Sequence, residues 1–81
     1  MPTFRVLNQN GDERISWSAE GLERGDADAR AAVREAERIF ARERSRGATA
    51  FRVMPGRQAE RIDVLDLAAD ETVVIPPMAG G

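Results

Sequence analysis

The sequence predicts an α+β fold in which one main helix packs on one face of a mixed sheet of four or five strands. Three observations support this prediction. Short segments with alternating apolar and polar residues lie on both sides of one long segment with helical periodicity. The helical segment has a single narrow apolar face, which one sheet is enough to cover. A chain of 81 residues also has room for one thin core only, so we expect one domain over residues 1–75, followed by an extended tail over residues 76–81.

Two strands are expected near the N-terminus, over residues 3–9 and 13–17. Between them lies Asn10-Gly11, the dipeptide that most readily supplies the positive φ angles of a tight hairpin turn. We therefore predict an antiparallel β-hairpin. Trp17, the only tryptophan in the sequence, is expected to close the edge of the core at the end of this hairpin.

A polar stretch interrupted by glycines follows over residues 18–28, and we expect a loop there. Asp26 and Asp28 at its end are suited to cap a helix and to face its positive end. The helix is expected from about residue 28 to Arg46, where Gly47 provides a stop. Apolar residues in it are spaced four, three and four apart. The expected buried stripe is Ala29, Val33, Ala36 and Phe40, with Ala32 and Ile39 alongside.

Three more strands are expected, over residues 48–54, 60–64 and 72–75. Pro55-Gly56 between the first two is a good central pair for a type II turn. The last strand has three consecutive apolar residues, which is typical of a strand in the centre of a sheet. We expect it to lie parallel to the first strand, with the helix crossing one face in the right-handed sense that such connections prefer. The residues expected to pack between helix and sheet are Phe4, Val6, Ile15, Val33, Phe40, Phe51 and Val53.

Composition argues against most kinds of enzyme. The chain has no histidine, no cysteine and no tyrosine, and all 12 of its basic residues are arginines. It therefore lacks the usual zinc ligands, a thiolate, a base that titrates near pH 7 and a nucleophilic amine side chain. The adjacent carboxylates Asp12-Glu13 and Asp70-Glu71 are better explained as solvated surface charge. We expect a protein that is not an enzyme and that binds no metal or cofactor itself.

The same composition bears on location and partners. No apolar stretch is long enough to span a bilayer and the first residues lack the pattern of a signal peptide, so we expect a cytoplasmic protein without a membrane partner. Five arginines recur at four-residue spacing along the helix: Arg30, Arg34, Arg38, Arg42 and Arg46. Glutamates are interleaved with them and the net charge is −2, so we interpret this ridge as a solvated face and expect no nucleic-acid partner.

The C-terminal residues from Ile75 to Gly81 read IPPMAGG. Proline fixes φ, lacks an N–H group and favours an extended residue before it, so Pro76 and Pro77 should end the sheet ladder and stiffen the chain. Six extended residues beyond Ile75 project roughly 19 Å, enough to enter the active site of another protein. Gly80 and Gly81 have no side chains, so they can pass a constriction that admits only backbone.

The order of elements, together with IPPMAGG at the C-terminus, resembles the ubiquitin-like β-grasp family. The resemblance extends to bacterial ubiquitin-like modifiers and to diglycine sulfur carriers such as the small subunit of molybdopterin synthase. It covers the tail residue by residue and the rest of the chain as topology. The resemblance implies a β-grasp fold and a Gly81 carboxylate that an activating enzyme adenylates with ATP. It also implies either a conjugating enzyme and a deconjugating metalloprotease as partners, or a sulfur-accepting synthase.

Two kinds of function remain open at this point. One is a carrier or modifier, in which the diglycine end is conjugated to protein amines or delivers sulfur as a thiocarboxylate. For a modifier, the absence of lysine implies attachment as a single copy, and a coding bias toward arginine explains it equally well. The other is a non-catalytic interaction module that uses the open sheet face, with the tail incidental. The candidate residues are Gly81 and Gly80 as the reactive end, and Ala79, Met78, Pro77, Pro76, Ile75 and Leu7 as partner-binding residues.

Overall fold

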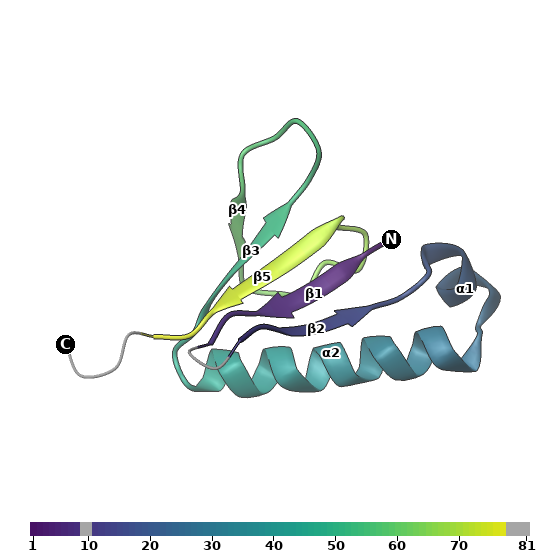
Figure 1. Cartoon of the computed structure of the whole chain (residues 1–81), viewed down its shortest axis with the longest axis horizontal. Coiled ribbons are helices and arrows are strands. Elements are labelled where there is room, and N and C mark those ends of the chain that lie inside the picture. Colours follow the sequence, from purple (N-terminus) through teal and green to yellow (C-terminus); the bar gives the residue numbers. More distant parts are fainter. Residues whose placement is uncertain (9–10, 78–81) are drawn as a thin grey trace.

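The computed structural model describes residues 1–8 and 11–77. Within these residues, five strands form one mixed sheet and one long helix lies along it (Figure 1). The elements are β1 (Thr3–Val6), β2 (Glu13–Ser16), α1 (Ala19–Arg24), α2 (Ala27–Ser45), β3 (Thr49–Val53), β4 (Glu60–Ile62) and β5 (Glu71–Ile75).

The order of the strands in the sheet is β2-β1-β5-β3-β4. β1 pairs antiparallel with β2 and parallel with β5, and β3 pairs antiparallel with both β5 and β4. The predicted hairpin and the predicted parallel pairing of the first and last strands are therefore confirmed. β5 lies in the centre of the sheet, as its run of apolar residues predicts.

Helix α2 buries the stripe that its periodicity predicts. Ala29, Val33, Ala36, Ile39 and Phe40 are all buried, and Ala32 is partly buried against the same core. On the sheet, the inward residues of β1 and β5 are fully or almost fully buried, and the ring of Phe4 meets that of Phe40 edge to face at a centroid distance of 6.5 Å. The aromatic pair therefore joins the first strand to the helix.

Two of the expected core residues, Phe51 and Val53, do not pack between helix and sheet. Ala50 is opposite Val74 in the register of β3 and β5, and both of these residues are fully buried. Because successive side chains of a strand point to opposite faces, Phe51 and Val53 lie on the other face, where they are half-buried. The small Ala50 faces the helix instead, so the prediction for these two residues was wrong.

The expected loop over residues 18–28 was also wrong in its first part, which forms helix α1. Ser18 caps this helix, because its Oγ accepts a hydrogen bond from the Gly21 N–H at 2.9 Å. Gly25 ends it with a φ of 78°, in the left-handed region that glycine adopts without strain. The polar composition that suggested a loop is that of a short, solvated helix with a cap at each end.

The connections between strands agree with the predicted turns wherever the structure describes them. Arg57 N–H donates to the Met54 carbonyl at 3.2 Å and Gly56 has a φ of 71°, which are the marks of the predicted type II turn. Asn10 lies outside the described residues. The first four strands are shorter than predicted by one to three residues, with β1 ending at Val6, whereas β5 begins one residue earlier than predicted, at Glu71.

An arginine on β3 fastens the segment between β4 and β5 to the sheet. Arg52 binds Glu60 at 2.9 Å and Asp66 at 2.8 Å. The Ala68 N–H also donates to Asp66 at 2.9 Å, and this bond, together with Arg52, holds the pKa of the Asp66 carboxyl below its usual value. The long connection is thus held by charge pairs as well as by apolar packing.

Aromatic rings on the two faces of the sheet should contribute differently to the free energy of unfolding. Phe40→Ala removes a ring that is 7% exposed in the core and should cost about 3–5 kcal/mol of unfolding free energy. Phe51→Ala removes a half-buried ring from the open face and should cost only about 1–2 kcal/mol. Urea denaturation of the two variants checks this, and equal shifts of the midpoint would place both rings in one core.

Candidate functional site

The root of the tail, Ile75-Pro76-Pro77, lies at one end of the central strand β5. The Leu7 N–H donates to the Val74 carbonyl at 3.0 Å, and Thr49 is opposite Ile75, so the β1 side holds β5 up to Val74 and β3 holds it up to Ile75, its last residue. The next two residues, Pro76-Pro77, have no N–H group to continue the ladder. The chain therefore leaves the sheet at a defined point, beside the C-terminal end of α2 (Figure 1).

The turn that follows helix α2 lies next to this root. The helix ends at Ser45, and Gly47 turns the chain toward β3 with a φ of +95°. A Cβ built on Gly47 would lie 3.9 Å from the Cγ of Pro77, so the turn and the second proline are neighbours. Pro76 is half-buried and Pro77 is exposed. The tail root thus sits between the edge of the core and solvent.

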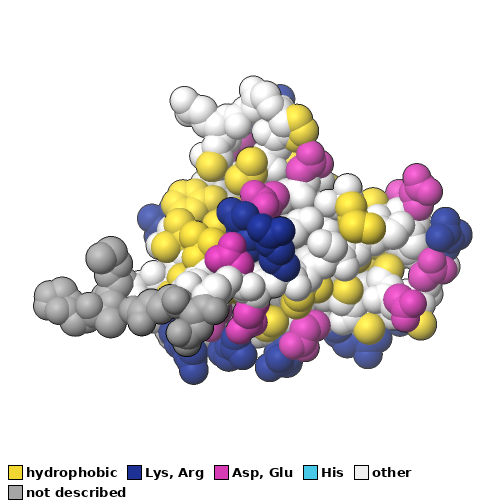
Figure 2. All heavy atoms as spheres, viewed as in Figure 1, with side chains coloured by type: hydrophobic (Ala, Val, Ile, Leu, Met, Phe, Trp, Pro, Cys, Tyr) yellow, Lys and Arg dark blue, Asp and Glu magenta, His cyan; other side chains and the backbone are white. Residues whose placement is uncertain are grey.

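An apolar area lies on the open face of the sheet next to this root. It consists of outward-facing residues of β3 and β5 and of the residue after β1, and we call it the sheet-face patch: Leu7, Phe51, Val53, Val73 and Ile75. Leu7 and Ile75 lie at the tail root, whereas Val53 is opposite Glu71 at the other end of β5. Phe51 is directly opposite Val73, and Ile75 is 41% exposed. Leu7 follows β1 with the alternation that places it on the same face as Arg5, which is paired with Val73. Figure 2 shows apolar side chains gathered in this part of the molecule.

Charged residues border the sheet-face patch on the β1 side. Arg5 is opposite Val73 on the same face, and its guanidinium lies between two carboxylates, 3.6 Å from Asp12 and 3.8 Å from Glu71. Basic and acidic side chains lie together at this place in Figure 2. Since surface ion pairs contribute little to stability, these charges chiefly give the face a polar rim around its apolar centre.

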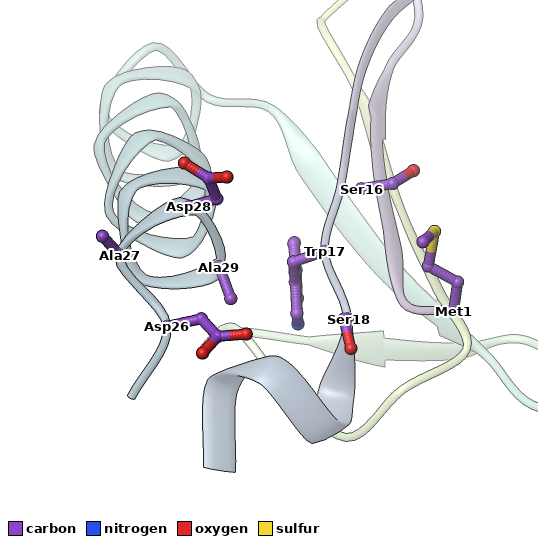
Figure 3. A pocket seen from close by; sticks show the side chains of 8 residues that line it. All are labelled: Met1, Ser16, Trp17, Ser18, Asp26, Ala27, Asp28 and Ala29. Carbon is purple, nitrogen blue, oxygen red and sulfur yellow. The ribbon is translucent and has the colours of Figure 1, made fainter. Parts of the chain in front are cut away.

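A separate pocket of about 430 Å³ lies at the other end of the molecule, where α2 begins (Figure 3). Trp17 stands in its wall between Ser18 and the start of the helix and is only 4% exposed, which confirms its expected place at the core edge. Asp26 and Asp28 also line it. These carboxylates disfavour binding of an anion, whereas the positive N-terminal end of the helix disfavours binding of a cation. The pocket therefore has no clear ligand preference.

Residues 1–8 and 11–77 hold no group of three or more carboxylates that lie close enough together to bind a metal ion. Neither helix in these ranges is long and apolar enough to cross a membrane.

The structure brings together four of the residues that the sequence nominates. Leu7, Ile75, Pro76 and Pro77 all lie at the tail root. The other four nominated residues, Met78, Ala79, Gly80 and Gly81, lie outside the described residues. Sequence reasoning missed the patch residues Phe51 and Val73, because only the register of β3 and β5 shows that they share a face.

Comparison of the chain with protein-family models, with curated proteins and with solved structures found no match. The functional inference therefore depends on the residues and geometry of this chain.

Because the tail root lies at the edge of the core, we expect that residues beyond Pro77 can be removed without loss of stability. Ending the chain after Pro77 should leave the melting temperature unchanged, because the buried side chains of β5 end at Val74. Val74→Ala, in contrast, opens a cavity worth about 2 kcal/mol and should lower the melting temperature by about 10 °C. Thermal denaturation followed by circular dichroism checks both. A truncated chain that melts as early as the Val74 variant would make the tail part of the fold.

Proposed function

We propose that this chain is a small carrier or modifier of the ubiquitin-like β-grasp type, with a body over residues 1–75 and a tail over residues 76–81 that ends in the functional group. The observation that carries the proposal is the tail root. The central strand is held on the β1 side up to Val74 and by β3 up to Ile75, and it is followed at once by two prolines. A rigid body that presents a narrow, glycine-ended chain from its centre suits delivery of that end into another protein.

The chemistry proposed for the end is the chemistry that the resemblance to the ubiquitin-like family implies, in which an activating enzyme supplies ATP and the catalytic groups. It suits a chain with no histidine, cysteine or lysine, whose body has no side chain suited to activate its own carboxylate. A carboxylate oxygen of Gly81 attacks the α-phosphate of ATP, forms the acyl-adenylate and releases pyrophosphate. Sulfide-level sulfur from a donor then attacks the acyl carbon and AMP leaves, which gives a thiocarboxylate. Alternatively, a thiolate of the enzyme displaces AMP to form a thioester, and a protein amine then attacks the acyl carbon and releases the thiol, which gives an isopeptide.

The sheet-face patch is the proposed docking surface for the activating enzyme. It adjoins the tail root, so an enzyme that contacts the patch holds the tail in a fixed direction. An apolar centre with a polar rim is the usual anatomy of a protein interface. The patch also supports the second candidate function, an interaction module in which this face binds a partner and the tail plays no part. The two candidates differ in whether the diglycine is needed.

ATP–pyrophosphate exchange with the activating enzyme of the native host tests the proposal. Gly80→Val should abolish exchange, because a β-branched side chain prevents the backbone from threading the active site. Ile75→Asp should lower the exchange rate at low protein concentration, since it places a charge in the sheet-face patch. Ala31→Asp adds the same charge to an exposed position of α2 and should exchange like the parent.

Circular dichroism of each variant separates loss of docking from loss of fold. Exchange that survives Gly80→Val would remove the diglycine from the mechanism. If in addition Ile75→Asp alone weakens binding of a partner, the interaction module replaces the carrier as the better account.

A further inference from the structure

A second apolar surface lies on the helix side of the sheet, away from the sheet-face patch. It is a groove of about 260 Å³ between α2 and the residues that follow β4, and we call it the side groove: Glu37, Phe40, Asp63, Val64 and Leu65. Phe40 belongs to the buried core and Leu65 packs against it, so these two residues make the groove apolar at its base. Glu37 and Asp63 place a carboxylate on each of its two walls.

Val64 is the most exposed member of the side groove that is apolar, with an exposed fraction of 77%. The chain is tied to other elements on both sides of it. On one side, Asp63 binds Arg44 of α2 at 2.9 Å. On the other side, Asp66 binds Arg52 of β3 at 2.8 Å. The exposure of Val64 therefore belongs to a segment that is held at two points, so a partner can cover this side chain without rearranging the segment.

The two carboxylates of the side groove indicate what kind of partner fits it. Glu37 is exposed, and in residues 1–8 and 11–77 no basic side chain pairs with it. Arg44 donates to Oδ1 of Asp63, so Oδ2 is left to accept from a partner. An acidic segment would meet two like charges here, whereas a cation next to an apolar side chain would find a carboxylate on either wall.

We propose that the side groove binds a segment of a partner protein in which one branched apolar side chain lies between two basic residues. The apolar side chain enters the groove and contacts Phe40, Val64 and Leu65. The basic side chains pair with Glu37 and Asp63 at the rim, so the site has the apolar centre and polar rim of a protein interface. Its volume of about 260 Å³ is below the roughly 300–1,000 Å³ of most small-molecule sites. The inference does not rest on the proposed function, because the groove and the tail root use different residues.

Amide chemical shifts of the whole isotopically labelled chain test the proposal with three synthetic probes. These are N-acetyl-Arg-Leu-Arg amide and its analogues with glutamine or glutamate in place of arginine. At pH 7 and about 20 mM salt, where surface charges are weakly screened, the arginine probe should give saturable shifts at Val64 and Leu65 with a Kd of about 1–10 mM. It should bind about threefold more tightly than the glutamine probe, and the glutamate probe should bind most weakly.

Three variants separate the apolar and the charged parts of the site. Glu37→Gln removes the unpaired carboxylate and should reduce the preference for the arginine probe over the glutamine probe to below about twofold. Val64→Thr should weaken both of these probes by about threefold, because it replaces a methyl group by a hydroxyl that the probe would cover. Glu23→Gln removes a carboxylate from an exposed position of α1 and should bind like the parent. Amide shifts away from the groove that match the parent show that each variant is folded.

The proposal is wrong if the arginine probe causes no saturable shifts, or if the shifts lie in the sheet-face patch instead of the side groove. Equal binding of the arginine and glutamate probes would also overturn it, because the two carboxylates would then select nothing. Shifts at the groove that grow with protein concentration, with no probe present, would make a second copy of this chain the occupant instead. None of these results bears on the exchange experiment with the activating enzyme, whose variants lie in the tail and in the sheet-face patch.

Discussion

The parallel pairing of β1 with β5 is the constraint on which the rest of the structure depends. Parallel strands cannot be joined by a tight turn, so the chain between β1 and β5 must cross over the sheet. Helix α2 is the longest element of that connection. The register sets Phe4 beside Thr72 and Val6 beside Val74, which places the buried residues of both strands under one helix. It also sends β5 out at the end of the sheet where α2 finishes, and so decides where the tail begins.

The two faces of the sheet differ in how far the body covers them. The helix-facing side of the sheet is closed by fully buried side chains such as Phe4 and Val74. The other side keeps an apolar patch that the body does not cover. The most constrained part of the molecule therefore adjoins the root of the tail. A tail root that follows a central strand has a neighbouring strand on both sides, whereas one that follows an edge strand has a neighbour on one side only.

Much of the fold was predictable because several local signals agreed. The four-three-four spacing predicts the buried face of α2, and the apolar run of β5 predicts its central place. The sequence does not show which side chains of β3 point toward the helix. An alternating segment is compatible with either orientation, and the small Ala50 faces the helix while Phe51 faces outward. Helix α1 does not follow from the polar composition of residues 18–28, which is also typical of a loop, although Ser18 and Gly25 are good caps.

The candidate site shows a similar limit. Prolines and glycines have fixed backbone properties, so the stiff tail root was predictable from Ile75 onward. The sheet-face patch depends on residues from strands that are distant in sequence. The buried Glu43 is a different case, since a glutamate among helical arginines looks solvated until its burial at the helix end is seen. Such groups become visible only when the register and the helix end are known.

The central claim is that the diglycine end is chemically activated, and mass spectrometry of the protein recovered from its native host tests it most directly. The account predicts chains that carry either a Gly81 thiocarboxylate or a branched peptide that links Gly81 to an amine of another protein. The first product identifies sulfur delivery and the second identifies conjugation. Recovery of only free, unmodified carboxylate, under conditions in which the host expresses the chain with its activating enzyme, would contradict the account.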